Sequence, residues 1–349
     1  MRVAFVGVKR KYKELDPSYI ESFNRYHLEL PWYYARSTPH EFLITTVDHE
    51  DDAPIVFDGG GTLRCVTEDS YRSGKHGAAD VVVHWRRWFA DLKGPRINLL
   101  NCQDQGFSDA WLDEVKSGYW GGGLHGFLCF PGWHELSIKL ELKASVRTFS
   151  NVTLGVDSDV YSPSPAKDPW MMLWASDPGR GLMGAVEVAA DVWRHKRRFK
   201  LHVCYPDYVK SPIVITHPAV VVHGSIPNGP KLWNLFNTAG WLPYSSTFHE
   251  PSSRAHRQAQ SAGAVVIYPP LMGTPSKLID DGMTGYVREF DKFAWRKLLI
   301  EKTGTDEQAR IAAASRALAV SEDWRVQADR FDKLIRRLCD DKSGGRRYF

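Results

Sequence analysis

This 349-residue sequence lacks long apolar runs, a signal-peptide pattern and a strong net charge. Each of these absences excludes a class of protein or of partner. No apolar run approaches the roughly 18 residues that a membrane-spanning helix needs, so the sequence predicts no transmembrane segment. The first residues, MRVAFVGVKRK, place their charges after the apolar stretch, which suits a β-strand better than a signal peptide. The net charge of +4 is mild and by itself indicates no polyanionic partner.

Cysteine is also sparse, because the chain has only five, widely spaced and without a Cys-x-x-Cys pair. This usage is typical of reduced thiols in a cytosolic protein, and it predicts neither a disulfide framework nor a zinc site. We therefore expect a cytoplasmic protein. The apolar fraction of 43% and the length of 349 residues suit two globular domains that each bury a core.

Strand-like apolar runs alternate with helical segments through nearly the whole chain, which predicts an α/β protein with parallel sheets covered by helices. In the first half we expect strands at 2–8, 41–47, 79–84, 97–101 and 126–130, and a helical segment 18–35 that Pro31 interrupts. The glycine-rich segments 58–61 and 121–123 are expected to be plain turns. In the second half we expect a helix over 182–194 and strands at 171–175, 201–205, 219–223, 241–246 and 264–268. The proline-rich segment 157–169 predicts an inter-domain linker.

One stretch of the second half combines a carboxylate with a predicted helix start. Glu250 precedes Pro251, which suits the first position of a helix, and Gly263 is expected to end that helix. Free N–H groups at Ser252 and Ser253 would form an anion site at the positive helix end. Glu250 beside them would accept hydrogen bonds from sugar hydroxyls, so the stretch suits a nucleotide-sugar.

A second motif, Asp177-Pro178-Gly179-Arg180-Gly181-Leu182, lies where a predicted strand turns into a helix. Phosphate groups are usually bound at this place in such folds. Arg180 has donors for two oxygens of a diphosphate, and Gly179 and Gly181 flank it as donor-binding positions. The structural alternative is a capped turn in which Arg180 only pairs with Asp177.

Together these motifs resemble the donor site of family 4 glycosyltransferases, retaining enzymes with the GT-B fold of two Rossmann-like domains facing across a cleft. The family pattern is a Glu, seven residues and a second Glu. Glu250 takes the first position, and Gln258 replaces the second. The resemblance implies that Glu250 lies by the donor sugar and Gln258 by the ribose. Family members usually have an Arg and, five residues later, a Lys-Gly pair. Arg180-Gly181 takes the place of the pair, and Ala175 takes the place of the Arg, so one expected cation is missing. Lys277 is a candidate for a second cation.

The resemblance also implies a domain plan and an activity. It implies an acceptor domain over 1–160, a nucleotide-sugar donor domain over 161–321, and a C-terminal helix within 322–349 that returns to the first domain. The implied activity is retaining transfer of a hexosyl or pentosyl group from a nucleotide-sugar to a hydroxyl of a glycan or lipid-linked glycan, with no resident cofactor and no metal. The likeness covers most of the second half, and the first half matches by architecture alone.

Candidates for the acceptor side follow predicted strands of the first half, where α/β sites form. The resemblance implies a polar residue there, often His or Asp, and His84 and Asp104 are the leading candidates, with His134 as a third. Each of these residues, taken alone, is more often a structural or surface polar group than a catalytic one.

A basic run of Lys9, Arg10 and Lys11, followed by Lys13, comes directly after the first predicted strand, and Trp85 is an aromatic acceptor candidate. Such a run is usually a solvated loop, but it also attracts polyanions such as nucleic acid, an anionic membrane surface or a phosphorylated glycan. Two alternatives stay open, the first supported by the basic run and the many aromatic residues and the second suggested by Gln258 and Ala175. One is a transferase acting on hydroxymethylated bases of phage DNA, and the other is a non-catalytic nucleotide-sugar-binding protein.

Overall fold

The computed structural model describes residues 1–7, 26–46, 50–51, 53–85, 87–94, 96–102, 108–130, 132–143, 146–150, 152, 154–206, 209, 211–250, 253–271 and 279–343, without side chains for 26–30 and 342–343. The described chain divides into two compact units. Unit 1 runs from Met1 to Gly155 and includes the chain again from Trp324, and unit 2 spans Val156–Asp323.

Unit 1 is built on an eight-stranded sheet in the order β3-β4-β2-β1-β5-β6-β7-β8. All neighbouring strands are parallel except the β3–β4 hairpin. The central strands are almost completely buried, as expected for a parallel sheet with both faces covered. The strands are β1 (Arg2–Val6), β2 (Glu41–Thr46), β3 (Ile55–Val56), β4 (Thr62–Thr67), β5 (Val81–Trp85), β6 (Ile97–Asn101), β7 (Gly126–Leu128) and β8 (Thr148–Phe149).

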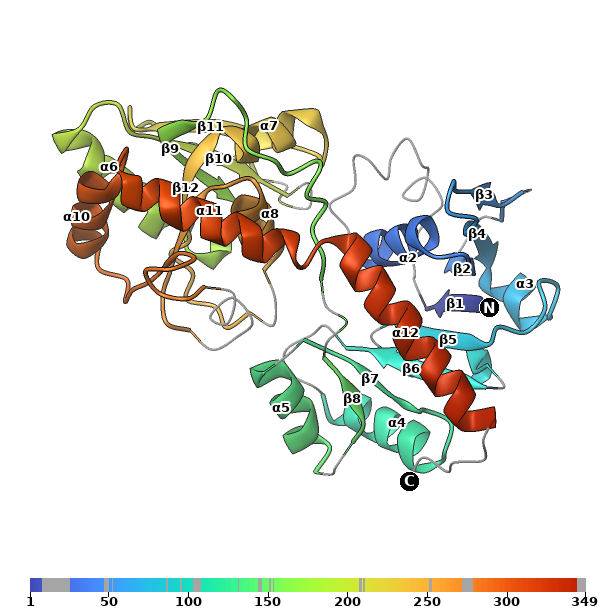
Figure 1. Cartoon of the computed structure of the whole chain (residues 1–349). Helices are drawn as coiled ribbons and strands as arrows, with labels where there is room; N and C mark the ends of the chain where they lie inside the picture. The colour runs from blue at the N-terminus through green and yellow to red at the C-terminus, as the bar shows by residue number, and fades with distance from the viewer. Residues whose placement is uncertain are drawn as a thin grey trace. The chain divides into compact units, whose positions relative to one another are not determined.

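The helices of unit 1 include the last helix of the chain, α12, which lies alongside α2 (Figure 1). The Phe331 ring of α12 stacks on Tyr34 of α2 with ring centroids 4.4 Å apart, and Trp324 stacks on Tyr33 at 5.1 Å. The C-terminal helix therefore packs in the first unit, as the sequence predicts. The helices are α2 (Tyr26–Ser37), α3 (Glu68–Arg72), η2 (Ala90–Leu92), α4 (Asp109–Trp120), α5 (Trp133–Glu141) and α12 (Trp324–Ser343).

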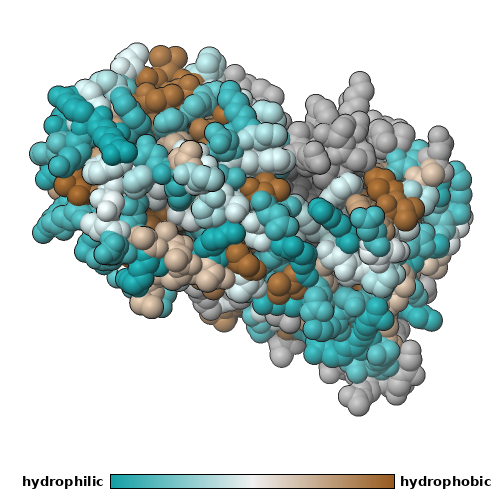
Figure 2. All heavy atoms as spheres, turned by 45° about the horizontal axis from the view of Figure 1, so that its top comes forward, coloured by the Kyte–Doolittle hydropathy of each residue, from teal (hydrophilic) through white to brown (hydrophobic). Residues whose placement is uncertain are grey.

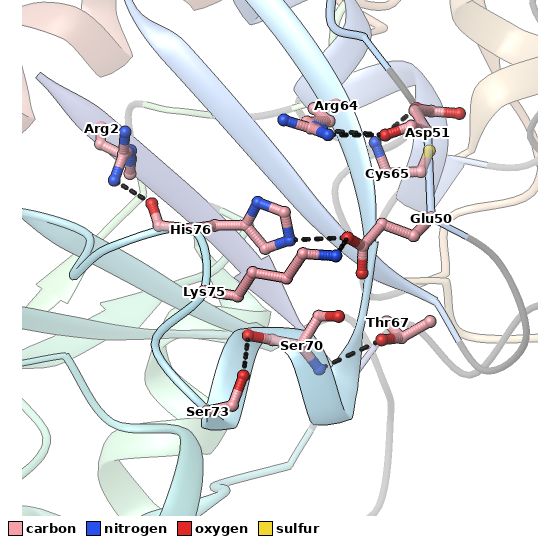
Figure 3. A network of polar contacts seen from close by, with 10 residues as sticks. All are labelled: Arg2, Glu50, Asp51, Arg64, Cys65, Thr67, Ser70, Ser73, Lys75 and His76. Atoms are coloured by element: carbon pink, nitrogen blue, oxygen red, sulfur yellow. Dashed lines mark hydrogen bonds and ion pairs between the residues drawn. The ribbon is translucent and has the colours of Figure 1, made fainter.

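Polar contacts hold the crossover from β4 through α3 to β5 in place (Figure 3). Lys75 and His76, which follow α3, both point to Glu50, and Arg2 of β1 donates to the carbonyl of His76. Hydrogen bonds from Lys75 and Ser70 lower the pKa of Glu50 to about 2. Lys75 and His76 both pair with the same carboxylate, so we assign this cluster a structural role.

Unit 2 contains a six-stranded parallel sheet in the order β11-β10-β9-β12-β13-β14. Its core includes three large side chains that are fully buried, Trp174, Trp241 and Trp295. The strands are β9 (Asp168–Ala175), β10 (Lys200–Tyr205), β11 (Val220–Ser225), β12 (Ala239–Pro243), β13 (Val265–Tyr268) and β14 (Tyr286–Val287). The helices are η3 (Pro178–Arg180), α6 (Leu182–His195), α7 (Pro230–Thr238), α8 (Arg254–Ser261), α10 (Lys292–Lys302) and α11 (Asp306–Val320).

Helices α2 and α8 differ from the sequence prediction in ways that have a physical reason. Pro31 lies inside α2 instead of interrupting it, because packing of this buried segment outweighs the hydrogen bond that a proline removes. Helix α8 begins at Arg254 with Ser253 as its N-cap, so the predicted start at Pro251 is wrong. Its predicted end is confirmed, since Gly263 follows the helix with a left-handed φ of 72°.

The molecular face in Figure 2 is mostly hydrophilic. Its hydrophobic patches are small and separate among the atoms coloured there. That face therefore offers no broad apolar surface within the described residues.

Candidate functional site

Two chain segments meet at the carboxyl edge of the unit 2 sheet. Strand β9 leads into the turn η3 and the start of α6, and β12 leads into the loop that carries Glu250. Strands β9 and β12 are parallel neighbours, so the segments that follow them lie side by side. Ligand sites of parallel α/β sheets form at this edge.

The turn after β9 is fixed by its own side chains and by the segment after β12. The Asp177 carboxylate accepts a hydrogen bond of 2.8 Å from the backbone N–H of Gly179. Gly181 has a φ of 111°, and a Cβ there would lie 2.1 Å from the carbonyl oxygen of Ser245. The Ser245 hydroxyl donates back to the Gly181 carbonyl at 2.7 Å. Only glycine suits this close approach, so Gly181 is needed to bring the two segments together.

Arg180 and Glu250, the two leading sequence candidates, form an ion pair. The Glu250 side chain is 2% exposed and the Arg180 side chain 40%, so a buried carboxylate holds a half-exposed guanidinium. Arg180 is thus held by Glu250 across the two segments, while Asp177 caps the turn. The alternative of a turn in which Arg180 only pairs with Asp177 does not describe this arrangement.

Tyr244, just after β12, completes the contact. Its hydroxyl donates to Glu250 Oε1 at 2.7 Å, the same oxygen that accepts from Arg180 Nη1. Within the described part of the chain, Glu250 Oε2 has no hydrogen-bond partner. The carboxylate therefore accepts from both Arg180 and Tyr244 on Oε1, and Oε2 is a buried acceptor without a partner among the described residues.

The charge states follow from burial and from the ion pair. Burial lowers the pKa of Arg180, but the neighbouring Glu250 charge more than reverses this, so the pKa is raised overall. Burial and the same carboxylate raise the pKa of Tyr244, so its hydroxyl keeps its hydrogen. Burial, with a smaller effect of Arg180, lowers the pKa of His256 to about 3, so His256 is neutral near neutral pH.

The remaining donor-side candidates are partly described. Ser253 is 4% exposed at the start of α8, and Gly179 lies in the capped turn. The Gln258 amide is 6% exposed and donates to the Tyr161 hydroxyl at 2.8 Å. Its predicted ribose contact stays a prediction. Ser252 and Lys277 lie outside the described residues.

The acceptor-side candidates His84 and Trp85 of unit 1 are both buried. His84 is fully buried at the end of β5, where its Nε2 lies 3.3 Å from Asn98 Oδ1 and its Nδ1 accepts from the Phe89 N–H at 3.3 Å. Burial lowers its pKa to about 4. Its neighbour Trp85 is 7% exposed. The acceptor roles of both residues stay predictions.

The other acceptor-side predictions lie outside the described residues, since Asp104, Lys9, Arg10 and Lys11 have no described position. His134 is 1% exposed, and its Nδ1 accepts from the Phe130 N–H at 3.1 Å, an arrangement typical of a structural histidine.

Sequence reasoning missed Tyr244, Ser176 and His256. Tyr244 ends an apolar run and Ser176 follows another, so both positions resemble ordinary strand ends. The one available signal was a polar group placed directly after each of two buried strands. This signal becomes meaningful only when the strands are known to be neighbours.

Metal ligation and membrane spanning both find no support in the described residues. They contain no group of three or more His, Cys, Asp or Glu side chains arranged to hold a metal ion. None of the helices there has both the length and the apolar character to cross a membrane.

The fold of this chain is similar to those of several solved structures. No family model and no curated protein matches the sequence. A solved structure of a glycosyltransferase from Rickettsia africae matches with a TM-score of 0.68 and 12% identity, over 97% of this chain and 98% of that one. HepE from Anabaena, in complex with UDP, matches with a TM-score of 0.64 and 13% identity, over 97% and 100%.

The chain has the GT-B fold. TarM of S. aureus also matches this GT-B chain, with a TM-score of 0.57 and 13% identity over 73% of it, but the chain spans about half of TarM, 54% of its length. Identities this low show the fold alone. The fold class expected from the sequence is confirmed, including the helix α12 that packs in unit 1.

Proposed function

We propose that this GT-B chain is a glycosyltransferase that moves a sugar from a nucleoside-diphosphate sugar to an acceptor hydroxyl. The observation that carries the proposal is the Arg180–Glu250 pair at the carboxyl edge of the unit 2 sheet. The structural neighbours support the same class, because one is named a glycosyltransferase and HepE is solved with UDP, with UDP and glucose, and with UDP-glucose.

In the proposed donor site, Arg180 binds the diphosphate and Glu250 binds the sugar. The leaving diphosphate gains negative charge as the bond to the sugar breaks, and the half-exposed Arg180 guanidinium offers donors to it. The buried Glu250 keeps Oε2 as an acceptor for a sugar hydroxyl. Arg180 is thus the charge stabiliser and Glu250 the sugar-orienting group.

Retention of configuration is part of the proposal and rests on the resemblance to family 4 transferases. In this chemistry the acceptor hydroxyl approaches the face that the diphosphate leaves, and the chain needs no covalent nucleophile. The proposed site likewise uses no metal, since Arg180 provides the positive charge.

The proposed acceptor is a hydroxyl of a glycan or lipid-linked glycan. The basic run that motivates a DNA acceptor or a contact with an anionic membrane surface lies outside the described residues. No described contact therefore favours the polyanion over the glycan. Unit 1 is the proposed acceptor domain, with His84 and Asp104 as its polar candidates.

A donor screen tests the proposal. The purified chain is incubated with UDP-glucose, UDP-N-acetylglucosamine, GDP-mannose and ADP-glucose, with and without oligosaccharides or hydroxymethylated DNA, and nucleoside diphosphate release is followed. We expect one donor to be consumed and one acceptor class to accelerate it, with NMR showing a retained anomeric configuration. Binding of a donor without any turnover would instead support the non-catalytic alternative, and no binding of any donor would overturn the proposal.

A further inference from the structure

We propose that Tyr244 is a positioning residue, which acts on the donor diphosphate through Glu250 and Arg180. This inference rests on the proposed function, because it assigns Tyr244 to the same site. The four side chains Ser176, Tyr244, Glu250 and Arg180 form one continuous chain of hydrogen bonds that joins the ends of β9 and β12.

The hydroxyl of Tyr244 is the centre of this chain. It donates to Glu250 Oε1 at 2.7 Å and lies 3.0 Å from the Ser176 hydroxyl. Because the Tyr244 hydrogen goes to the carboxylate, Ser176 must be the donor to Tyr244. The Tyr244 oxygen therefore accepts from Ser176 and donates to Glu250, and these two contacts fix its place.

The Tyr244 ring leaves the hydroxyl little freedom to move. The residue is 1% exposed, and the ring stacks on Trp174 with centroids 5.1 Å apart and planes 10° apart. On another side His256 meets it edge-on at 4.5 Å. A rigid ring thus holds one oxygen of a buried carboxylate, and that oxygen is the one bound by Arg180.

The Arg180 side chain is mobile unless a partner such as Glu250 holds it. Its side chain is 40% exposed and long, so it loses rotamer freedom when it is held in one direction. Without the Tyr244 hydroxyl, the Glu250 carboxylate is free to rotate about its Cγ–Cδ bond. Oε1, the oxygen that accepts from Arg180, then moves with it. A guanidinium that must first be oriented binds a diphosphate less tightly than one already oriented.

Tyr268 provides a matched control on the neighbouring strand. Its ring lies 6.1 Å from that of Tyr244 at an interplanar angle of 18°, and it also meets His256 edge-on, at 4.9 Å. Tyr268 is fully buried, and in the described part of the chain its hydroxyl has no hydrogen-bond partner. Tyr244→Phe and Tyr268→Phe therefore remove the same atom from similar surroundings, but only the first interrupts the hydrogen-bonded chain.

The experiment begins with calorimetric titrations of the wild-type protein with UDP, ADP and GDP, and continues with the tightest of the three. Because the lost hydrogen bond is to a charged group, we expect Tyr244→Phe to weaken binding by about tenfold. Ser176→Ala should weaken binding in the same direction but less, and Tyr268→Phe should stay within about twofold of wild type. Circular dichroism melting of each variant checks folding.

A double-mutant cycle with Glu250→Gln separates positioning from a general structural effect. If Tyr244 acts through Glu250, Tyr244→Phe should add less than about twofold in the Glu250→Gln background. Full additivity, or equal binding by Tyr244→Phe and Tyr268→Phe, would overturn the inference while the wild type still binds. Failure of the wild type to bind any of the three nucleoside diphosphates would instead overturn the proposed function.

Discussion

Arg180 and Glu250 lie 70 positions apart in the sequence, and their side chains form an ion pair at the carboxyl ends of neighbouring strands of unit 2. The carboxylate is buried and the guanidinium is partly exposed. The buried carboxylate fixes the position of a cation that still faces solvent, which is the arrangement expected of a preformed anion site. The proposed donor site depends on this relationship.

Arg180→Ala should lower donor turnover by roughly 10²-fold or more, because the leaving diphosphate loses its charge stabiliser. Arg180→Lys should give an intermediate rate, since lysine keeps the charge without the planar fork of donors. Arg288→Ala is the control, because Arg288 is another partly exposed arginine of unit 2 with an acidic partner, Asp281. Donor hydrolysis measured for all three variants checks this. Near-wild-type turnover of Arg180→Ala would remove Arg180 from the site.

Glu250→Gln should reduce transfer more than it reduces nucleoside diphosphate binding. Glutamine keeps the size of the side chain and one acceptor oxygen, but it loses the charge that holds Arg180 and one acceptor for a sugar hydroxyl. The measurement is the ratio of nucleotide-sugar affinity to nucleoside diphosphate affinity, by calorimetry on wild type and variant. An unchanged ratio together with unchanged turnover would show that Glu250 has no part in sugar binding.

Gly181→Ala should destabilise unit 2 by more than about 2 kcal/mol, because the new Cβ meets the Ser245 backbone at a left-handed φ of 111°. Gly282→Ala is the matched control. Gly282 has a φ of 72° but nothing within 4 Å of the added Cβ, so only the backbone cost of about 1 kcal/mol applies. Urea unfolding of both variants gives the comparison. Equal destabilisation would mean that the close approach of the two segments is unimportant.

His256 should make the protein less stable in mild acid. Its pKa is about 3 in the folded chain, against 6.5 for an unperturbed histidine, so between these values the unfolded state binds the extra proton. Stability is therefore lost as the pH falls from 6.5 toward 3, by about 2 kcal/mol near pH 5. His256→Phe should lose less stability between about pH 7.5 and about pH 5 in urea unfolding. Parallel curves for both proteins would contradict a buried neutral His256.

The acceptor class makes its own prediction for Lys9, Arg10, Lys11 and Lys13. With the proposed glycan acceptor, exchanging all four for Gln should leave the acceptor KM unchanged and insensitive to salt. A DNA acceptor releases counterions when it binds, so its KM would rise steeply with salt in the wild type and less steeply in the variant. Acceptor KM measured against salt for both proteins decides between the two.

Local patterns predicted much of the fold because most strands here are continuous apolar runs. Strand β6 covers Ile97–Asn101 as predicted, and α6 extends one residue past the prediction, to His195. The predicted start of α8 was wrong because Pro251 is a strong local signal, whereas the helix begins at Arg254 with Ser253 as its N-cap. The hairpin β3–β4 was not expected, since its edge strand β3 is only two residues long and gives too short a pattern to predict a strand.

The two charged residues of the site were found from sequence, but their contact was not. Arg180 and Glu250 each belong to a recognisable local motif, whereas their pairing depends on β9 and β12 being neighbours. Tyr244 was missed for the same reason, because a tyrosine at the end of an apolar run has the pattern of a core residue. Its role follows only from the oxygen that it shares with Arg180.

The proposed donor site requires that a nucleoside diphosphate binds at Arg180. Calorimetric titration of the wild type and of Arg180→Ala with UDP, ADP and GDP measures this without knowledge of the sugar or the acceptor. We expect one of the three to bind the wild type with a stoichiometry near one, and the variant to bind it at least about tenfold more weakly. Equal affinity for both proteins, or no binding of any of the three to the wild type, would contradict it.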